Sequence, residues 1–217
     1  MCKYTTIYAI VDDFCKIYEE WLQHKLIRSN KQRNRKGKLS LSECLAIMIF
    51  YHFSPFKNFK TYYQFFIIGG NLFKTTPCYE RFIQIIPSLF LPLMVMMHYI
   101  SGKQTSFYYV DSTHFSVCKN IRISNHKTFC GLAARGHSSI DWFYGFKLHM
   151  IINERSEIVA LKITKGNVDD RKAFEEMAIK KDLKGKVYAD KGYLSKDLFN
   201  KLYQQGLTLI TGIKRNM

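Results

Sequence analysis

The pattern of hydrophobic and polar residues changes near residue 105, and it predicts helices before that point and strands after it. Between Val11 and Leu26, hydrophobic residues recur every three or four positions, as in a helix with one buried face. Ser40 and Glu43 form a capping-box pattern before the apolar run CLAIMIFYHF, which predicts a second helix. Further helices are expected over residues 60–68 and 78–86. We therefore expect residues 1–104 to be mostly helical.

The most apolar stretch runs from Ile83 to Ile100 and is interrupted by Pro87 and Pro92. A membrane-spanning helix needs about 20 predominantly apolar residues without such interruptions. We therefore expect a buried pair of helices bent at the prolines, and no membrane association.

From Ser106 onward, strand and helix patterns alternate. SFYYVDST predicts one strand, and GFKLHMIIN and EIVALKITKGN predict an antiparallel hairpin around a turn at 154–156. There follow a helix over 168–182, the strand KVYADKGY, a helix with Ser195 as N-cap and Gly206 as its stop, and the strand LTLITGIKRNM. This β-β-β-α-β-α-β order predicts an α/β domain with a ribonuclease-H-like mixed sheet over residues 105–217.

Charge adds a partner to this picture. The chain has 33 Lys and Arg against 17 Asp and Glu, a formal net charge of +16, which favours nucleic acid first and an anionic membrane second. The segment between the first two predicted helices contains no acid and is either a solvated linker or an arm that contacts DNA phosphates, the role we favour. Its basic residues are Lys25, Arg28, Lys31, Arg33, Arg35, Lys36 and Lys38.

The six cysteines are scattered without a CxxC pair, which is typical of reduced thiols in the cytoplasm. The first residues carry acids where a signal peptide needs an apolar core, so we expect a cytoplasmic protein associated with the nucleoid. His114, Cys118, His126 and Cys130 loosely suggest zinc, but the tight pairs of structural zinc sites are absent. Lys119, Arg122 and Lys127 in the same stretch are better explained as contacts to the DNA backbone.

Two acids stand at the ends of predicted strands, Asp111 after the first and Asp190 after the fourth. Ligand sites in open α/β sheets gather at strand ends, and two adjacent carboxylates need a cation between them. Two such ions about 3.5–4 Å apart support phosphodiester chemistry. On position alone, however, a turn or capping role is the more ordinary explanation of each acid.

Lys147 and His149 alternate with Phe146 and Leu148 along one predicted strand. They face the DNA, face the two acids, or lie on an exposed strand face, and the sequence leaves these alternatives open. The aromatic row WFYGF at 142–146 is better explained as core than as a platform for base stacking.

Five ordered blocks resemble insertion-sequence DDE transposases, and are most similar to those of the insertion sequence 982 family. The blocks are VDST (110–113), CKNIRISNHK (118–127), WFYGFKLH (142–149), KGNVDDR (165–171) and ADKGY (189–193). The resemblance implies that Asp111 and Asp190 are catalytic acids that bind Mg²⁺ or Mn²⁺ in a two-metal site. It also implies a bacterial enzyme, an oligomer on DNA, that cleaves terminal inverted repeats and joins the ends to target DNA.

The resemblance also suggests further residues near the site. It allows such a position for Asp170 or Arg171, although capping is the simpler explanation there. Tyr193 is expected to pack under the site or to contact DNA. In the family, the N-terminal helical region contributes to recognition of the transposon end, in agreement with the basic segment.

The family pattern departs from this sequence at its end. DDE transposases carry a third acid, a Glu, on the helix after the fifth strand, whereas the only acid here after Asp190 is Asp197, which precedes that strand. We therefore expect a truncated catalytic domain without the last helix, impaired alone, whose Glu is either lost or supplied by frameshifting. Two alternatives stay open: a non-catalytic DNA-binding remnant that inhibits intact transposase, and another ribonuclease-H-like nuclease.

Overall fold

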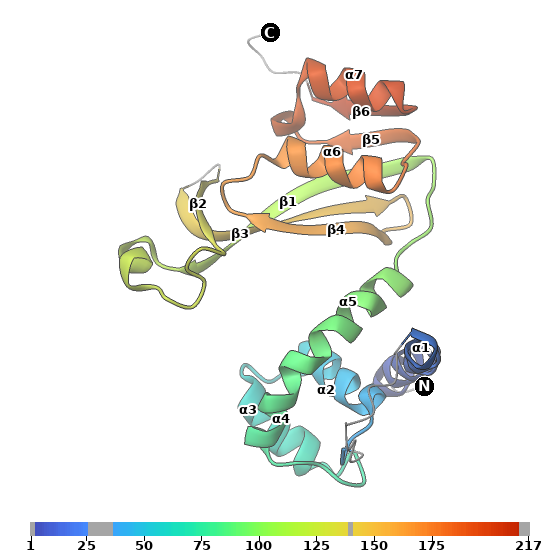
Figure 1. The fold of residues 1–217 in the computed structure, drawn as a ribbon, viewed down its shortest axis with the longest axis vertical. Helices are drawn as coiled ribbons and strands as arrows, with labels where there is room; N and C mark the ends of the chain where they lie inside the picture. Colours follow the sequence, from blue (N-terminus) through green and yellow to red (C-terminus); the bar gives the residue numbers. More distant parts are fainter. Residues whose placement is uncertain (1–2, 26–36, 139–140, 213–217) are drawn as a thin grey trace. The chain divides into compact units, whose positions relative to one another are not determined.

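A computed structural model describes residues 3–25, 37–138 and 141–212 of the chain. The chain divides into two compact units, Met1–Ile100 and Ser101–Met217 (Figure 1). The first unit is helical in its described residues, and the second contains a mixed sheet with two helices. The change of pattern near residue 105 therefore lies close to the boundary between the units.

The N-terminal unit is built from short helices around an aromatic core. Its helices are α1 (Lys3–Lys25), α2 (Leu41–Phe53), α3 (Phe59–Thr61), the π-helix η1 (Tyr62–Ile68), α4 (Tyr79–Ile85), the 3₁₀ helix η2 (Ile86–Leu89) and α5 (Phe90–Tyr99). The capping box at the start of α2 is confirmed, because Ser40 Oγ accepts from Glu43 N and the Glu43 carboxylate accepts from Ser40 N. Tyr62 and Tyr63 are fully buried and donate their hydroxyls to backbone carbonyls.

The apolar stretch around Pro87 and Pro92 forms a helical segment from Tyr79 to Tyr99. Its most apolar window is only 22% buried, and Phe90 and Leu91 are largely exposed, so the expected burial is wrong. Pro87 stands at the start of η2, where its missing N–H leaves no helical bond unmade. The segment is long and apolar enough to span a membrane, which for one helix is weak support for such a role.

The C-terminal unit contains six strands whose pairing gives the expected mixed sheet. They are β1 (Phe107–Cys118), β2 (Ala134–His137), β3 (Trp142–Asn153), β4 (Ile158–Lys165), β5 (Gly185–Ala189) and β6 (Leu207–Thr211). The order is β2-β3-β1-β5-β6, and β4 also pairs with β3. Strands β1, β2 and β4 each pair with β3 in antiparallel orientation, whereas β5 pairs in parallel with β1 and β6, as in a ribonuclease-H-like fold. Two expectations change: β1 continues past Asp111, and the short β2 is additional.

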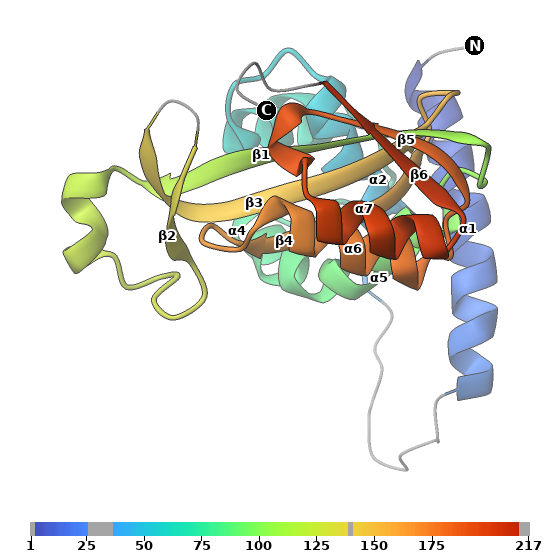
Figure 2. The same ribbon diagram turned by 90° about the horizontal axis from the view of Figure 1, so that it is seen from above.

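Helices α6 (Asp170–Lys180) and α7 (Lys196–Gln204) lie on the same face of this sheet (Figure 2). Phe174 and Leu202 from these helices pack against the fully buried Tyr108 and Ile151 of the sheet. Ser195 is confirmed as the N-cap of α7, since its hydroxyl accepts from Leu198 N. The core of this unit is therefore formed on the helix-covered face.

Residues 115–138 and 141–146, which we call the arm, lie around the ends of β1 and β3 and extend beyond the helices (Figures 1 and 2). The arm contains the 3₁₀ helix η3 (Asn120–Asn125) and β2. No acid occurs in the sequence between Asp111 and Asp141. The sheet therefore carries a basic extension at one end.

Candidate active site

Asp111 and Asp190 stand at the point where two parallel strands separate. The pairing of β1 with β5 ends at Val110 and Ala189, so Asp111 is the next residue of β1 and Asp190 directly follows β5. Beyond this point β1 continues alongside β3 alone, through Ser116 and Cys118. Asp111 thus lies within β1 and not at its end. The site lies at a carboxyl end of parallel strands where the strand order switches, the usual place for a ligand.

Neither acid is used for capping or ion pairing by the residues that the structure describes. Asp190 precedes the 3₁₀ turn η4 (Lys191–Tyr193), but its side chain makes no capping hydrogen bond. Asp111 accepts only a hydrogen bond from the neighbouring Ser112 N, at 2.7 Å. Both side chains are exposed. The ordinary explanation of a capping Asp therefore does not account for Asp190, and the two adjacent carboxylates are left to be neutralised from outside.

Tyr193 places a buried hydroxyl next to these acids. Its side chain is buried, and the hydroxyl makes no hydrogen bond of normal geometry with the described residues, although the Ser112 hydroxyl is near enough to affect it. Burial, with a smaller contribution from the carboxylates of Asp170, Asp111 and Asp190, raises the pKa of Tyr193 to about 12. All three carboxylates therefore lie near enough to this buried phenol to affect it. The role expected of Tyr193 beneath the site or at DNA stays a prediction.

Lys147, His149 and Asp170 form a connected cluster on the helix-covered face. Lys147 Nζ donates to Asp170 Oδ1 at 2.9 Å and to Val168 O at 3.1 Å. His149 is completely buried and shares a 2.8 Å hydrogen bond with the Thr164 hydroxyl, while its Nδ1 lies 3.8 Å from Asp170 Oδ1. Of the three alternatives for this strand, an exposed face is therefore excluded for His149, and Lys147 faces α6.

The environment of His149 favours its neutral form. Burial lowers the pKa of His149, and the charges of Lys147 and Lys162 lower it further, against the opposing effect of Asp170. Asp170 interacts with both the His149 ring and the Tyr193 hydroxyl. The cluster therefore connects the first turn of α6 to the strand ends that carry the acids.

Comparisons with known proteins agree with this geometry. A family model described as "Transposase DDE domain" matches residues 101–217, more than half of the chain. The chain belongs to this family of DDE-domain transposases. Among curated proteins none matches.

One solved structure supports the fold of this chain. A piggyBac transposase synaptic complex with hairpin DNA, determined by cryo-electron microscopy, has a TM-score of 0.53 at 12% identity, covering 100% of this chain and 52% of that chain. The chain thus spans about half the length of that transposase. A Mos1 transposase paired-end complex with the left transposon end has a TM-score of 0.30 at 9% identity, covering 89% and 66%, which is too low for further argument.

Arg171 pairs with an acid of its own helix terminus and forms no ion pair with Asp111 or Asp190. Its guanidinium contacts Asp169 Oδ2 at 2.6 Å, and Asp169 caps α6 by accepting from Arg171 N. The capping explanation thus holds at Asp169, whereas the carboxylate of Asp170 is held by Lys147.

The basic residues expected to contact DNA fall into two groups. Lys119, Arg122 and Lys127 lie in the arm, where none of them forms an ion pair with a described residue. Of the basic segment near the N-terminus, Lys38 is exposed. The others, Lys25 (side chain), Arg28, Lys31, Arg33, Arg35 and Lys36, lie outside the described residues. A role of either group in DNA binding stays a prediction.

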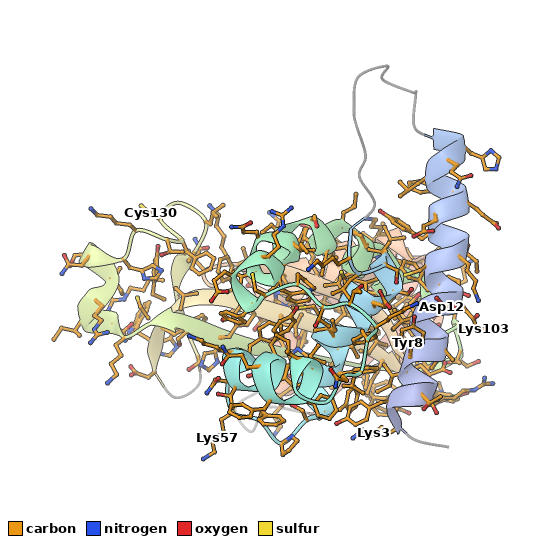
Figure 3. All side chains as sticks on the ribbon, turned by 90° about the horizontal axis from the view of Figure 1, so that it is seen from below. Lys3, Tyr8, Asp12, Lys57, Lys103 and Cys130 are labelled. Atoms are coloured by element: carbon orange, nitrogen blue, oxygen red, sulfur yellow. The ribbon has the colours of Figure 1, made fainter. Side chains whose placement is uncertain are left out.

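The metal-binding capacity of the described residues rests on few ligands. They contain no group of three or more His, Cys, Asp or Glu side chains arranged to hold a metal, so His114, Cys118, His126 and Cys130 do not converge. Cys130 is exposed on the arm (Figure 3). The pair of Asp111 and Asp190 offers hard oxygen ligands, and Mg²⁺ commonly takes only one or two carboxylates and fills its other positions with water and phosphate oxygens. The donor set therefore fits a divalent cation that binds together with DNA.

Two contributors to the site were missed in the sequence. Ser112 lies beside the Tyr193 hydroxyl, and Thr164 holds the His149 ring. The signal for Ser112 is its alternation with the buried Val110, which puts both on the helix-covered face. Thr164 has no such signal, because its role depends on the register between β3 and β4.

Proposed function

We propose that this protein carries out DNA transposition for an insertion sequence of the 982 family in a bacterium. In this reaction it would bind terminal inverted repeats, cleave the DNA strand and join it to target DNA. The observation that supports the proposal most directly is the placement of Asp111 and Asp190 at adjacent positions where β1 and β5 separate. Two unpaired acids on a chain with a net charge of +16 suit a polyanionic substrate whose phosphate is bridged by cations.

Asp111 and Asp190 would hold Mg²⁺ or Mn²⁺ in a two-metal site. The bound ions would supply neutralisation of the phosphate charge and activation of the attacking hydroxyl. The chain's own residues position the carboxylates: β1 is paired on both sides up to Val110, and Tyr193 packs beneath them. The Lys147–Asp170 pair fixes the first turn of α6 against β3.

The DDE resemblance requires a third acid, and residues 1–217 offer a poor candidate for it. Asp197, the only acid in the sequence after Asp190, lies in the first turn of α7. We therefore propose that these 217 residues alone bind DNA but cleave it weakly, and that a third carboxylate from outside them is needed for full activity.

The deciding experiment measures strand cleavage on DNA that carries the ends of the element from which the gene comes. With Mg²⁺ or Mn²⁺ we expect weak nicking at the terminal repeats that is abolished by EDTA and reduced at least about 100-fold by Asp111→Ala or Asp190→Ala. Asp197→Ala is the matched control and should leave the nicking unchanged. Salt-sensitive DNA binding without any metal-dependent nicking would identify a non-catalytic remnant. Cleavage confined to branched DNA or RNA–DNA hybrids would identify another ribonuclease-H-like nuclease.

A further inference from the structure

The hairpin of β2 and β3 separates a buried and an exposed side of the arm. Its register pairs Arg135 with Tyr144 and His137 with Trp142, so these four side chains share one face. Phe143, between them in sequence, points to the other face and is 4% exposed, whereas Trp142 is 50% exposed. The expectation that the WFYGF row is core is therefore correct for Phe143 and wrong for Trp142.

The exposed indole of Trp142 is held in place by its neighbours. The Arg135 guanidinium lies over the ring at 5.1 Å from its centroid, and the His137 ring meets it edge-on at 5.0 Å. On the backbone, Asn120 Nδ2 donates to Trp142 O at 2.7 Å. A large aromatic surface exposed to water costs free energy, and ordering it beforehand lowers the cost of binding a ligand.

Two pockets share the residues 117–119 at the end of β1, and the first of them is also lined by Trp142. The first, about 490 Å³, is lined by Trp142, Lys119, Asn120 and neighbouring residues, and its one acid, Asp141, accepts a hydrogen bond from Trp142 N. The second, about 400 Å³, contains no acid. It is lined by Val117, Cys118, Lys119, Arg122, Asn125 and His126.

The second pocket has the chemistry of an anion site. Lys119, which lines both pockets, and Arg122 have no acidic partner in the part of the chain that the structure describes. His126 buries Nε2 without a hydrogen-bond partner among those residues. An ammonium, a guanidinium and a side-chain amide around one space are the donors that phosphate groups use.

We propose that the arm binds a single-stranded stretch of DNA, with a base stacked on Trp142 and the adjoining phosphates at Lys119 and Arg122. The inference rests on the proposed function, which makes DNA the substrate. Duplex bases have both faces covered by their neighbours, so only an unpaired or unstacked base can lie against an indole inside a pocket. Stacking with phosphate contacts from a basic groove is the general mode of single-strand binding. The arm would therefore hold DNA that strand cleavage has freed from its duplex.

Fluorescence can test the stacking directly, because the chain has only two tryptophans, Trp21 in α1 and Trp142 in the arm. In a Trp21→Phe variant, the emission of Trp142 should be strongly quenched by an oligothymidine of about 15 nucleotides and hardly by a blunt duplex of the same length. In a Trp142→Phe variant, the emission of Trp21 should not distinguish the oligothymidine from the duplex. Quenching of Trp142 that is equal with duplex, or absent at saturation with single strand, overturns the proposal.

Binding affinity gives the second measurement, made in EDTA so that no cleavage is required. Trp142→Ala should weaken oligothymidine binding roughly tenfold or more and leave duplex binding unchanged, with Trp142→Phe retaining most of the affinity. If Trp142→Ala does not fold, as judged by circular dichroism, the quenching in the Trp21→Phe variant decides. Unchanged single-strand affinity in a folded Trp142→Ala protein overturns this inference alone, since nicking at Asp111 and Asp190 does not depend on it. Absence of all DNA binding overturns it together with the proposed function.

Discussion

Two regions of the C-terminal unit differ in how their charged side chains are paired. One is the helix-covered face, and the other consists of Asp111, Asp190 and the arm. On the helix-covered face, four basic side chains form ion pairs with acids: Lys147–Asp170, Lys162–Glu176, Arg171–Asp169 and Lys201–Glu175. At the strand ends and in the arm, Asp111, Asp190, Lys119 and Arg122 form no ion pair with any residue in the described ranges. Lys147–Asp170 and Lys162–Glu176 join α6 to the sheet, and Lys201–Glu175 joins the two helices. The unpaired charges are available to partners from outside.

The difference in charge pairing indicates which surface of the protein binds a polyanionic partner. A net charge of +16 predicts a polyanionic partner but does not say which surface meets it. Unpaired charges of both signs occur along β1: the acids lie at the point where β5 leaves it, and the cations follow its end. The acids suit cations and the cations suit phosphates, so both are expected to bind different parts of one metal–DNA complex.

The largest effect on stability is expected from breaking the least exposed ion pair. Lys147 is 13% exposed and Asp170 33%, so Asp170→Asn leaves a cation with little water around it and should lower the free energy of unfolding by about 2 kcal/mol. Urea unfolding would show a lower midpoint with an unchanged m-value.

The matched control for that substitution is Asp169→Asn. Asp169 and Arg171 are 48% and 44% exposed, and Asn is as good an N-cap as Asp, so the cost should stay below about 1 kcal/mol. If the two substitutions lower the free energy of unfolding equally, the burial of the Lys147–Asp170 pair does not determine its contribution to stability.

The difference between the two regions also shows how far the sequence could predict the structure. Strand and helix order followed from periodicity, and the caps at Ser40 and Ser195 were found because capping is a local pattern of side chain and backbone. The adjacency of Asp111 and Asp190 was expected because both end predicted strands. These features depend on a few neighbouring residues or on a common topology.

Features that depend on register or on long-range packing could not be predicted. The continuation of β1 beyond Asp111 depends on its pairing with β3, and the short β2 depends on the same strand. The sequence alone did not determine which face of the sheet His149 occupies, because its burial requires α6 to lie over β3. The exposure of Phe90 and Leu91 was missed for the opposite reason, since an apolar residue is expected to be buried unless its surroundings are known.

The next effect concerns the unpaired cations of the arm. Replacing both Lys119 and Arg122 with Gln should weaken DNA binding about tenfold near physiological salt, because each contributes to phosphate binding. The slope of log K against log salt concentration should fall in magnitude by about 1.4 for single strands, since each phosphate that is no longer neutralised removes about 0.7. Fluorescence anisotropy at several salt concentrations measures both quantities.

The control variant removes the same number of positive charges from lysines that form ion pairs within the protein. Lys184 and Lys201 form ion pairs with Asp182 and Glu175, so the double Gln variant at these two positions should keep the unsubstituted slope. If both double variants reduce the slope equally, net charge and not pairing determines where DNA binds.

A smaller, pH-dependent effect is expected from His149. Burial and the nearby Lys147 and Lys162 hold its pKa below the ordinary value of 6.5, while Asp170 opposes them. The unfolded chain therefore takes up a proton more readily, so the stability that neutral His149 contributes is complete above about pH 6.5. It is lost as the pH falls toward the folded pKa, by at most about 1.4 kcal/mol per pH unit.

Urea unfolding between pH 7.5 and about 5 can isolate this contribution, because His149→Gln removes the titration and keeps a polar group near Thr164. The unsubstituted protein should lose stability faster than the variant below pH 6.5. His24→Gln, at an exposed position in α1, should follow the unsubstituted protein. Parallel curves for all three would mean that His149 titrates alike in both states.

The smallest effect on stability is expected where the effect on activity is largest. Asp111→Asn removes one of two adjacent carboxylates that have no described cationic partner, so without divalent cations its free energy of unfolding should stay within about 0.5 kcal/mol of the unsubstituted protein or rise slightly. Mg²⁺ should raise the melting temperature of the unsubstituted protein but not that of the variant, because only a bound ion shifts the equilibrium toward the folded state. A large loss of stability without Mg²⁺ would place Asp111 with Asp170 among the residues that hold the fold. If replacing Asp111 leaves the free energy of unfolding unchanged and removes the stabilisation by Mg²⁺, the role of this carboxylate is to bind the cation that accompanies the DNA substrate.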